Sequence, residues 1–360
     1  MSTSILDETS FGRLAQQKPQ RPWRHRPVNF KLAVTLAVLV PALIIALLFT
    51  YTEIPAPIIM VVFYLPIQLI AGAISAVITR GSRGIADSMI IVSAIGATIF
   101  TVVILASLLW SLIVRGLPAF SSAFFTQNNV YINPSTPLAY GGIGHAVVGT
   151  IVIVLIATLV AVPLGIATAI YITEVRGRAV PYVRFFVQAM SGVPSVVAGL
   201  FILTVFVVTG IINQSAFAGG LAYAILMLPT VARTAEEVLK LVPDELRTGA
   251  LALGSTRART VLRVVLPAAK TGIITAMILG IARVVGETAP LLLTAGKNDQ
   301  TILNPFGATI SALPTYIFDN VALPYPDAVT RAWGSALTLM ILVALLFTLT
   351  RLLSGKRIRR

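Results

Sequence analysis

Long apolar runs separated by short polar or basic segments dominate the chain. A helix needs about 20 mostly apolar residues to cross the hydrocarbon layer of a bilayer. Eight runs reach that length: 32–52, 57–79, 88–115, 146–173, 185–211, 217–239, 269–295 and 332–353. None shows the alternating pattern of a transmembrane barrel strand. Because backbone groups in lipid must pair within their own segment, the runs predict an all-α polytopic membrane protein.

The composition supports lipid as the solvent of most of the chain. Hydrophobic residues make up 57% of the sequence and charged residues only 11%, whereas a soluble domain carries about a quarter charged residues. Cysteine is absent, which excludes disulfides and thiol chemistry. The two histidines, His25 and His145, lie in different segments, so we expect no metal site.

The positions of the basic residues orient the runs. With the N-terminus inside, the inner segments carry 23 of the 27 Lys and Arg residues: 1–31, 80–87, 174–184, 233–270 and 351–360. This bias predicts that both termini are cytoplasmic. It also accounts for the net charge of +14 without nucleic acid, since no basic stripe with interleaved aromatics remains.

The runs also suggest how the chain is divided. Residues 1–31 are polar and basic, and we expect a cytoplasmic tail that contacts anionic lipid. Residues 32–84 contain the first two runs, and residues 85–355 contain the other six.

The long inner segment at 233–270 has helix signals of its own. Pro243 ends the preceding helix, and Asp244 and Glu245 suit the start of a new one. Gly254 can end that helix, and Ser255 or Thr256 can cap the next. The pattern predicts two short helices that meet at a glycine, before Pro267 introduces the next run.

The same segment resembles the EAA loop of ABC importer permeases over about 243–267. That pattern reads E-A-A, three residues, G, nine residues, I-x-L-P, and this chain has T-G-A at 248–250, Gly254 and V-V-L-P at 264–267. Thr248 and Gly249 depart from the usual Glu-Ala, and Glu245 lies three residues earlier. The resemblance implies a helix that docks on a separate ATPase, through the residues Glu245, Thr248, Gly249, Ala250, Gly254, Leu266 and Pro267.

Two charges interrupt the run at 269–295. Arg283 and Glu287 are four residues apart, which predicts that they share one face of one helix, with a kink from Gly286 and Pro290. A charge inside a membrane is costly and is by default a functional candidate. Either the two side chains form a structural ion pair, or Arg283 contacts a passing anion while Glu287 weakens the attraction.

The run R-x-x-G-E-T-A-P at 283–290 resembles the phosphate-specific permeases of ABC importers. Further stretches agree with that family: S-G-V-P-S at 191–195, E-E-V-L-K-L-V-P at 236–243 and S-A-L-P at 311–314. The resemblance covers about 85–355. It implies a type I importer transmembrane domain with a six-helix core, here extended by two N-terminal helices, that imports inorganic phosphate across the cytoplasmic membrane of a bacterium.

The resemblance also implies partners and places the ATP chemistry elsewhere. The partners are a homologous sister permease, a dimer of ATPase subunits and an extracytoplasmic phosphate-binding protein. This chain has no Walker G-x-x-x-x-G-K-[ST] loop and no catalytic cluster. We therefore expect ATP and magnesium on the ATPase, and no cofactor on this chain.

Hydroxyl residues join the candidates for the translocation pathway. Thr288 follows Glu287 in the motif. Ser191 and Ser195 flank Gly192 and Pro194, which predict a kink or local unwinding. Their hydroxyls either satisfy backbone groups freed by the kink or line the path.

Three alternative functions remain open. The first is a permease of the same architecture for molybdate or sulfate, which Arg283 alone does not distinguish from a phosphate permease. The second is an ion-coupled secondary transporter or channel, a function that would not explain the EAA-like loop. A membrane-embedded enzyme lacks a catalytic cluster in this sequence.

Overall fold

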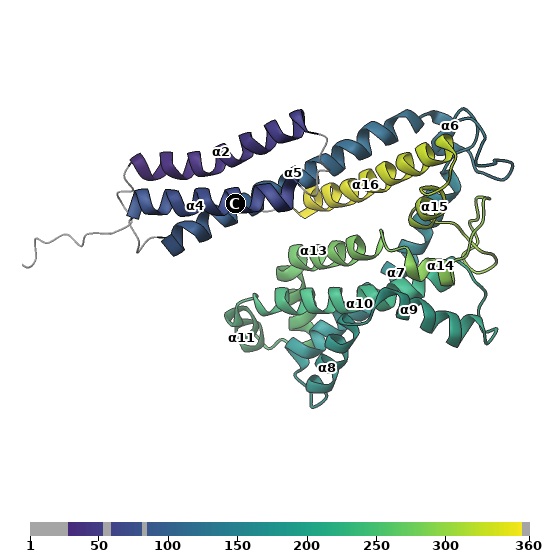
Figure 1. The fold of residues 1–360 in the computed structure, drawn as a ribbon. Helices are drawn as coiled ribbons and strands as arrows, with labels where there is room; N and C mark the ends of the chain where they lie inside the picture. Colours follow the sequence, from purple (N-terminus) through teal and green to yellow (C-terminus); the bar gives the residue numbers. More distant parts are fainter. Residues whose placement is uncertain (1–27, 53–58, 81–84, 355–360) are drawn as a thin grey trace, which may run out of the picture. The chain divides into compact units, whose positions relative to one another are not determined.

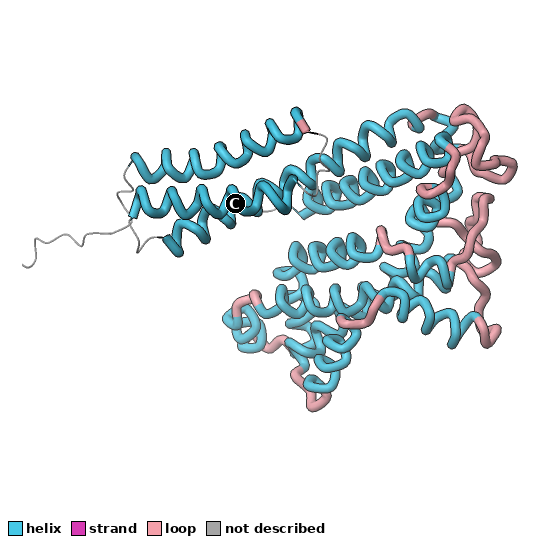
Figure 2. The backbone as a smooth tube through the Cα atoms, in the orientation of Figure 1, coloured by secondary structure: helices cyan, strands magenta, loops and turns pink. Residues whose placement is uncertain are grey.

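The computed structural model describes residues 28–52, 59–80 and 85–354, and all regular structure in these ranges is helical (Figures 1 and 2). Residues 1–27 of the predicted tail lie outside the described residues. The chain divides into two compact units, Met1–Leu108 and Leu109–Arg360. Each unit is described by itself.

The first unit is a small helical cluster held by polar contacts. Helix α2 (Val28–Tyr51) packs against α4 (Leu65–Arg80), which follows a π-helical turn, Ile59–Tyr64. The Gln68 amide donates to the Ala37 carbonyl at 3.3 Å, and the Tyr64 hydroxyl donates to the Gly96 carbonyl in α5 (Ile85–Gly116) at 3.2 Å. Such buried polar contacts hold helices together where lipid offers no other partner.

The second unit contains the remaining helices. They are α6 (Ser122–Thr126), α7 (Gly144–Ile170), α8 (Val180–Ser191), α9 (Ser195–Ile202), α10 (Ala216–Lys240), α11 (Asp244–Ala252), α12 (Arg257–Thr260), α13 (Leu266–Val284), α14 (Ala289–Thr294), α15 (Leu313–Asn320) and α16 (Pro326–Ser354). Short π-helical turns extend three of these helices: Tyr171–Val175 after α7, Leu203–Val207 after α9 and Val261–Val265 after α12.

Helix α10 forms the centre of this unit because it packs on both α7 and α13. Small residues allow the backbones to approach. A Cβ atom at Gly220 would lie 2.5 Å from Ile156 of α7, and one at Gly280 of α13 would lie 2.6 Å from Val231 of α10. Close packing through small residues is the usual way in which helices associate inside a membrane.

Six of the described helices are long and apolar enough to cross a membrane: Lys31–Tyr51, Ser93–Ala119, Gly144–Val175, Ala216–Lys240, Arg257–Val284 and Pro326–Thr348. Sequence analysis predicted eight spans. The run at 57–79 reaches its apolar length only by joining the π-helical turn to α4, in which Pro66–Ser75 is the apolar part. The run at 185–211 is divided between α8 and α9, which bend by 104°.

The break between α8 and α9 confirms the kink predicted from Gly192 and Pro194. Helix α8 ends at Ser191, and Pro194 precedes the first residue of α9. Proline has no backbone N–H to donate, and it disfavours the helical conformation of the residue before it. The local sequence is therefore enough to break this run.

The run at 269–295 begins earlier and ends earlier than predicted. A continuous helix extends from Arg257 to Val284 and passes through Pro267, so the second short helix of the loop is the first part of a span. The π-helical turn at Val261–Val265 changes the hydrogen-bond register just before the proline, which lies in the first turn of α13. The predicted break near Gly286 and Pro290 is present, because α14 starts only at Ala289.

A buried arginine fixes the loop between α6 and α7. Arg331 of α16 is 2% exposed, and its guanidinium donates to the carbonyls of Thr136, Pro137 and Tyr140 at 2.7, 2.7 and 3.0 Å. These bonds explain how a loop without charged residues keeps an ordered path beside α16.

Candidate functional site

The segment after α10 forms the predicted pair of short helices. Pro243 precedes α11, and Asp244 and Glu245 occupy its first turn. Gly254 has φ +81°, a left-handed conformation that glycine adopts without a steric cost. The helical segment that begins with α11 ends at this residue. Thr256 then caps α12, since its hydroxyl accepts from the Arg259 amide at 3.4 Å. The prediction of two helices that meet at Gly254 is confirmed, whereas the second helix does not end before Pro267 but continues into the span.

The residues predicted to dock an ATPase differ in how exposed they are. Glu245, Thr248, Gly249 and Gly254 are exposed, and neither glycine has another atom within 4 Å of the place where a Cβ would stand. Pro267 is exposed as well, whereas Ala250 and Leu266 are half-buried. Leu266 is half-buried beside a core of residues from α7, α10 and α13: Ala169, Ala235, Leu239, Val242, Val265, Ala269 and Ala276.

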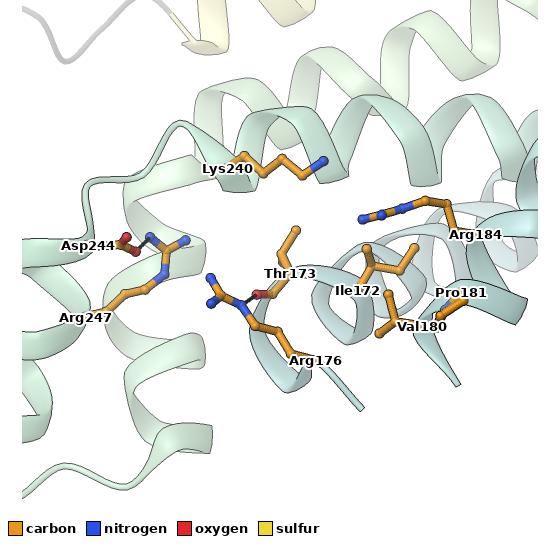
Figure 3. A pocket seen from close by; sticks show the side chains of 9 residues that line it. All are labelled: Ile172, Thr173, Arg176, Val180, Pro181, Arg184, Lys240, Asp244 and Arg247. Atoms are coloured by element: carbon orange, nitrogen blue, oxygen red, sulfur yellow. Dashed lines mark hydrogen bonds and ion pairs between the residues drawn. The ribbon is translucent and has the colours of Figure 1, made fainter. Parts of the chain in front are cut away.

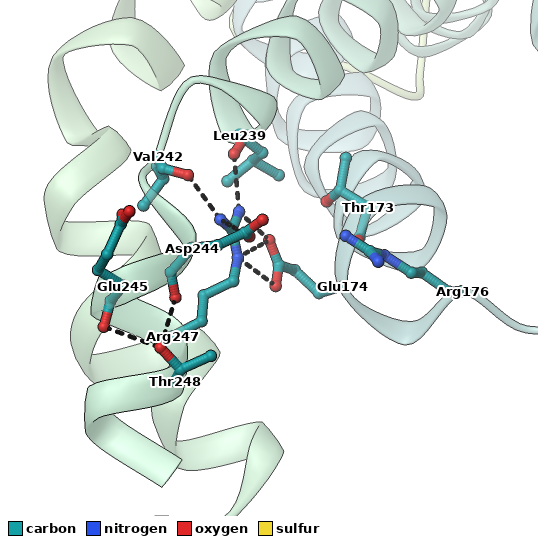
Figure 4. Close-up of polar contacts among 9 residues, drawn as sticks. All are labelled: Thr173, Glu174, Arg176, Leu239, Val242, Asp244, Glu245, Arg247 and Thr248. Atoms are coloured by element: carbon teal, nitrogen blue, oxygen red, sulfur yellow. Dashed lines mark hydrogen bonds and ion pairs between the residues drawn. The ribbon is translucent and has the colours of Figure 1, made fainter. Parts of the chain in front are cut away.

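The contact that fixes this loop to the spans involves Arg247 of α11 (Figure 4). Its guanidinium donates to both carboxylate oxygens of Glu174, with distances of 2.8–3.2 Å. It also donates to Asp244 at 3.0 Å and to the carbonyls of Val242 and Leu239 at 2.6 and 2.9 Å. All three nitrogens of the guanidinium are therefore engaged.

This contact is sheltered from water. The Arg247 and Glu174 side chains are 15% and 8% exposed. The hydrogen bond with Glu174 raises the pKa of Arg247, partly offset by burial, so Arg247 stays charged at every physiological pH. Glu174 lies at the end of the long helix that includes α7, and Leu239 at the end of α10. Arg247 thus ties the loop to two spans.

Sequence analysis did not single out Arg247. Glu174 is 73 positions away along the chain. The signal present in the sequence was an isolated acid at the end of an apolar run, Glu174, together with a basic residue four positions after Pro243. Neither observation indicates the pairing by itself.

The second candidate region is the break between α13 and α14. Arg283 lies in the last turn of α13, and Glu287 lies after the helix has ended at Val284. They do not share one helical face, and no ion pair joins them in the described part of the chain. The helix ends too early because Gly286 and Pro290 disrupt the regular hydrogen bonding that the spacing argument assumed.

Two side chains of α10 hold this break instead. The Thr230 hydroxyl accepts from Arg283 at 3.0 Å, and the Tyr223 hydroxyl donates to the Glu287 carbonyl. Thr230 lies near the middle of α10, so the Arg283 guanidinium lies at about the middle depth of that span. Arg283 is exposed on this chain, whereas Glu287 and Thr288 are half-buried. Thr288 occupies the position before α14, and its carbonyl accepts from the Leu291 and Leu292 amides.

The remaining predicted pathway residues lie at the other break. The Ser191 hydroxyl donates to the Val187 carbonyl at 3.0 Å, which is a bond within its own helix. Ser195 starts α9, and α9 packs on α14, where a Cβ at Gly199 would lie 2.6 Å from Pro290. The two breaks therefore belong to neighbouring helices. The described ranges contain no group of three His, Asp or Glu side chains that would hold a metal ion.

The fold and the loop define a class of protein that comparison with known families identifies. A family model described as binding-protein-dependent transport system inner membrane component matches residues 161–359, which include α11, the break after α13 and α16. The chain belongs to this family of transport permeases.

The relatives identify the particular group within that class as PstA-type permeases. Phosphate transport system permease protein PstA 1 of Mycobacterium tuberculosis (strain CDC 1551 / Oshkosh) is 43% identical over 239 residues, covering 66% of this chain and 78% of the relative. Phosphate transport system permease protein PstA of Yersinia pestis is 36% identical over 252 residues, covering 69% and 83%. Among solved structures, an inward-facing MetNI methionine ABC transporter chain is 18% identical with a TM-score of 0.48, covering 61% of this chain and 95% of that one.

Proposed function

We propose that this chain is the permease subunit that admits inorganic phosphate to the cytoplasm in an ATP-driven importer, and that Arg283 contacts the anion in transit. The observation that carries the proposal is the depth, exposure and hydrogen bonding of the Arg283 side chain. It is a charged group at mid-depth of a span, it is exposed on the isolated chain, and one hydroxyl is its only hydrogen-bond partner among the described residues. A charge in that position faces a watery path or a partner subunit rather than lipid.

The chemistry of a guanidinium favours an oxyanion. Its planar fork of N–H donors matches two oxygens of a phosphate, and Thr230 engages only Nη1. Glu287 follows the same break, and its negative charge would limit how tightly an anion is held. Relatives of this chain are phosphate transport system permeases, which supports phosphate as the substrate.

The proposed complex has four kinds of component. A sister permease of the same class covers the exposed Arg283 face and closes the path. Two ATPase subunits, which bind ATP and magnesium, dock on the loop at about 243–267. A phosphate-binding protein delivers the substrate from outside. Both termini and the loop are cytoplasmic in a bacterial cytoplasmic membrane, as the basic residues predict.

The translocation residues divide by role in this proposal. Arg283 binds the anion, Glu287 and Thr288 tune that contact, and Ser195 contributes a hydroxyl near the break of α9. Ser191 has its hydroxyl engaged within α8, which favours the structural role for this residue.

A permease for molybdate or sulfate is the second candidate, because a guanidinium recognises tetrahedral oxyanions in general. The test is uptake of labelled phosphate into vesicles that contain this chain, its sister permease, the ATPase and the binding protein. We expect uptake that requires ATP and that excess sulfate or molybdate does not suppress. Uptake without ATP would contradict the importer, and preferential uptake of sulfate or molybdate would contradict the substrate.

A further inference from the structure

A cavity of about 410 Å³ lies beside the start of α11 (Figure 3), and none of the residues that line it belongs to the Arg283 break. Its walls come from the end of the α7 helix, the start of α8, the end of α10 and the start of α11. Four basic side chains and a single acid line it: Arg176, Arg184, Lys240, Arg247 and Asp244. Such a surplus of positive charge around a hollow is suited to an anion.

The acids that balance these cations lie on other sides of them. Arg184 and Lys240 share Glu236, at 2.8 and 2.6 Å, and Glu236 lines a separate cavity of about 250 Å³. Arg247 is turned to Glu174, which is not among the residues that line the larger cavity. Asp244 lines the cavity but is bonded to Arg247 at 3.0 Å. The carboxylates thus hold the basic groups in place and leave the cavity positive.

Arg176 is the one lining cation without a carboxylate partner in the described part of the chain. Its Nε donates to the Thr173 carbonyl at 2.9 Å, which leaves its terminal N–H groups without a partner there. Arg176 also has φ +52°, the only positive φ among the described non-glycine residues. A left-handed residue is common where a helix ends, and Arg176 is the C-cap of the π-helical turn after α7.

Exposed aromatic side chains lie on α8, the helix whose start forms one wall of the cavity. Tyr182, Phe185 and Phe186 of α8 are more than 60% exposed, as is typical of aromatic residues at a membrane–water interface. Arg184 of the same helix is half-exposed and bonded to α10. From these side chains we infer that the cavity lies near the membrane–water interface, on the side of the α11 loop.

We propose that this cavity is a second anion site, which binds a phosphate group through Arg176, Arg184 and Lys240. The group is either the headgroup phosphate of an anionic lipid or free inorganic phosphate on the side of the loop. The lipid source is independent of the transported substrate, and the free-phosphate source rests on the proposed function. In both cases the bound anion would join α8 to the end of α10, next to the Arg247 contact.

The test measures binding to the complete transporter purified in detergent without its binding protein. The probes are labelled inorganic phosphate and a short-chain phosphatidylglycerol, with the matching phosphatidylcholine as the zwitterionic control. Phosphate binding is measured with Arg283→Ala as the background, so that the pathway does not contribute. The variants are Arg176→Gln, Arg176→Lys and the matched control Arg178→Gln, which removes an exposed arginine that does not line the cavity.

We expect Arg176→Gln to weaken one probe about tenfold, Arg176→Lys to retain most of the affinity, and Arg178→Gln to leave it unchanged. Loss of phosphatidylglycerol alone identifies a lipid, and loss of inorganic phosphate alone identifies the free anion. Equal binding by wild type and Arg176→Gln, equal losses in Arg176→Gln and Arg178→Gln, or no binding by wild type would overturn the site. Binding is measured without transport, so a transporter that imports a different oxyanion would leave the lipid result standing.

Discussion

Arg247 and Arg283 lie in the same unit of this chain and are held in opposite ways. Arg247 is sheltered and donates to four residues through all three of its nitrogens. Arg283 is exposed and donates to one hydroxyl. A guanidinium has five N–H donors in a fixed geometry, so the number already used inside the protein decides what remains for a ligand.

The comparison separates two uses of a positive charge at a membrane protein's functional regions. A fully engaged guanidinium joins secondary-structure elements and moves with them, as Arg247 joins α11 to the ends of the α7 helix and α10. A sparsely engaged one keeps donors available for an anion. Three substitutions test this difference and a fourth tests the turn at Gly254, in order of decreasing expected effect.

Arg283→Ala is expected to reduce phosphate uptake by about 10- to 150-fold, since a hydrogen bond to a charged group contributes about 1.5–3 kcal/mol. The thermal stability of the complex and its content of ATPase should stay unchanged, because Arg283 has one internal partner. Vesicle uptake and thermal unfolding measure both properties. Arg283→Lys keeps the charge and should retain part of the uptake, and wild-type uptake by the alanine variant would remove Arg283 from the pathway.

Arg247→Ala is expected to lower stability and to uncouple ATP hydrolysis from uptake. It leaves Glu174 charged and sheltered without its partner, which costs about 3–5 kcal/mol. The melting temperature and the ratio of phosphate imported to ATP hydrolysed should both fall. Glu174→Ala in the same chain should recover part of the stability, since it removes the unpaired charge. A melting temperature equal to that of wild type would show that the contact does not hold the loop.

Gly254→Ala is expected to weaken retention of the ATPase moderately, because alanine at φ +81° is strained by about 1–2 kcal/mol. Gly249→Ala is the matched control within the same predicted ATPase contact: neither site has an atom within 4 Å of an added Cβ, and only Gly254 has a positive φ. Alanine in α11 should stabilise that helix slightly. The measurement is the amount of ATPase that co-purifies with each of the two variants. Equal retention by both variants would contradict a role for the left-handed turn.

Thr230→Val should have the smallest effect. It removes the one hydroxyl that orients Arg283 and keeps the side-chain volume, so we expect a change of about threefold in the apparent KM for phosphate. The maximal rate should stay close to that of wild type, because the guanidinium itself is still present. Uptake measured over a range of phosphate concentrations gives the apparent KM and the maximal rate separately. A loss as large as that of Arg283→Ala would mean that Thr230 contacts the anion directly.

The sequence predicted features that depend on local chemistry. Runs of apolar residues predicted eight spans, and six of them are long apolar helices in the described residues, because a helix in lipid satisfies its own backbone. The breaks at Pro194 and near Pro290 followed from residues that cannot continue a helix. The two short helices meeting at Gly254 followed from caps and from the one residue that turns freely there. The positions proposed to bind an anion or an ATPase were also found by motif, and they remain predictions.

Only the tertiary structure decided which distant residues meet. Glu174 and Arg247 are far apart in the chain and become partners because the α7 helix and α10 end where α11 begins. Arg283 and Glu287 are close in the chain, yet the end of α13 at Val284 takes them off a common face and gives them separate partners on α10. Sequence periodicity describes positions along one regular helix, whereas contacts between helices depend on how the helices pack and where each one stops.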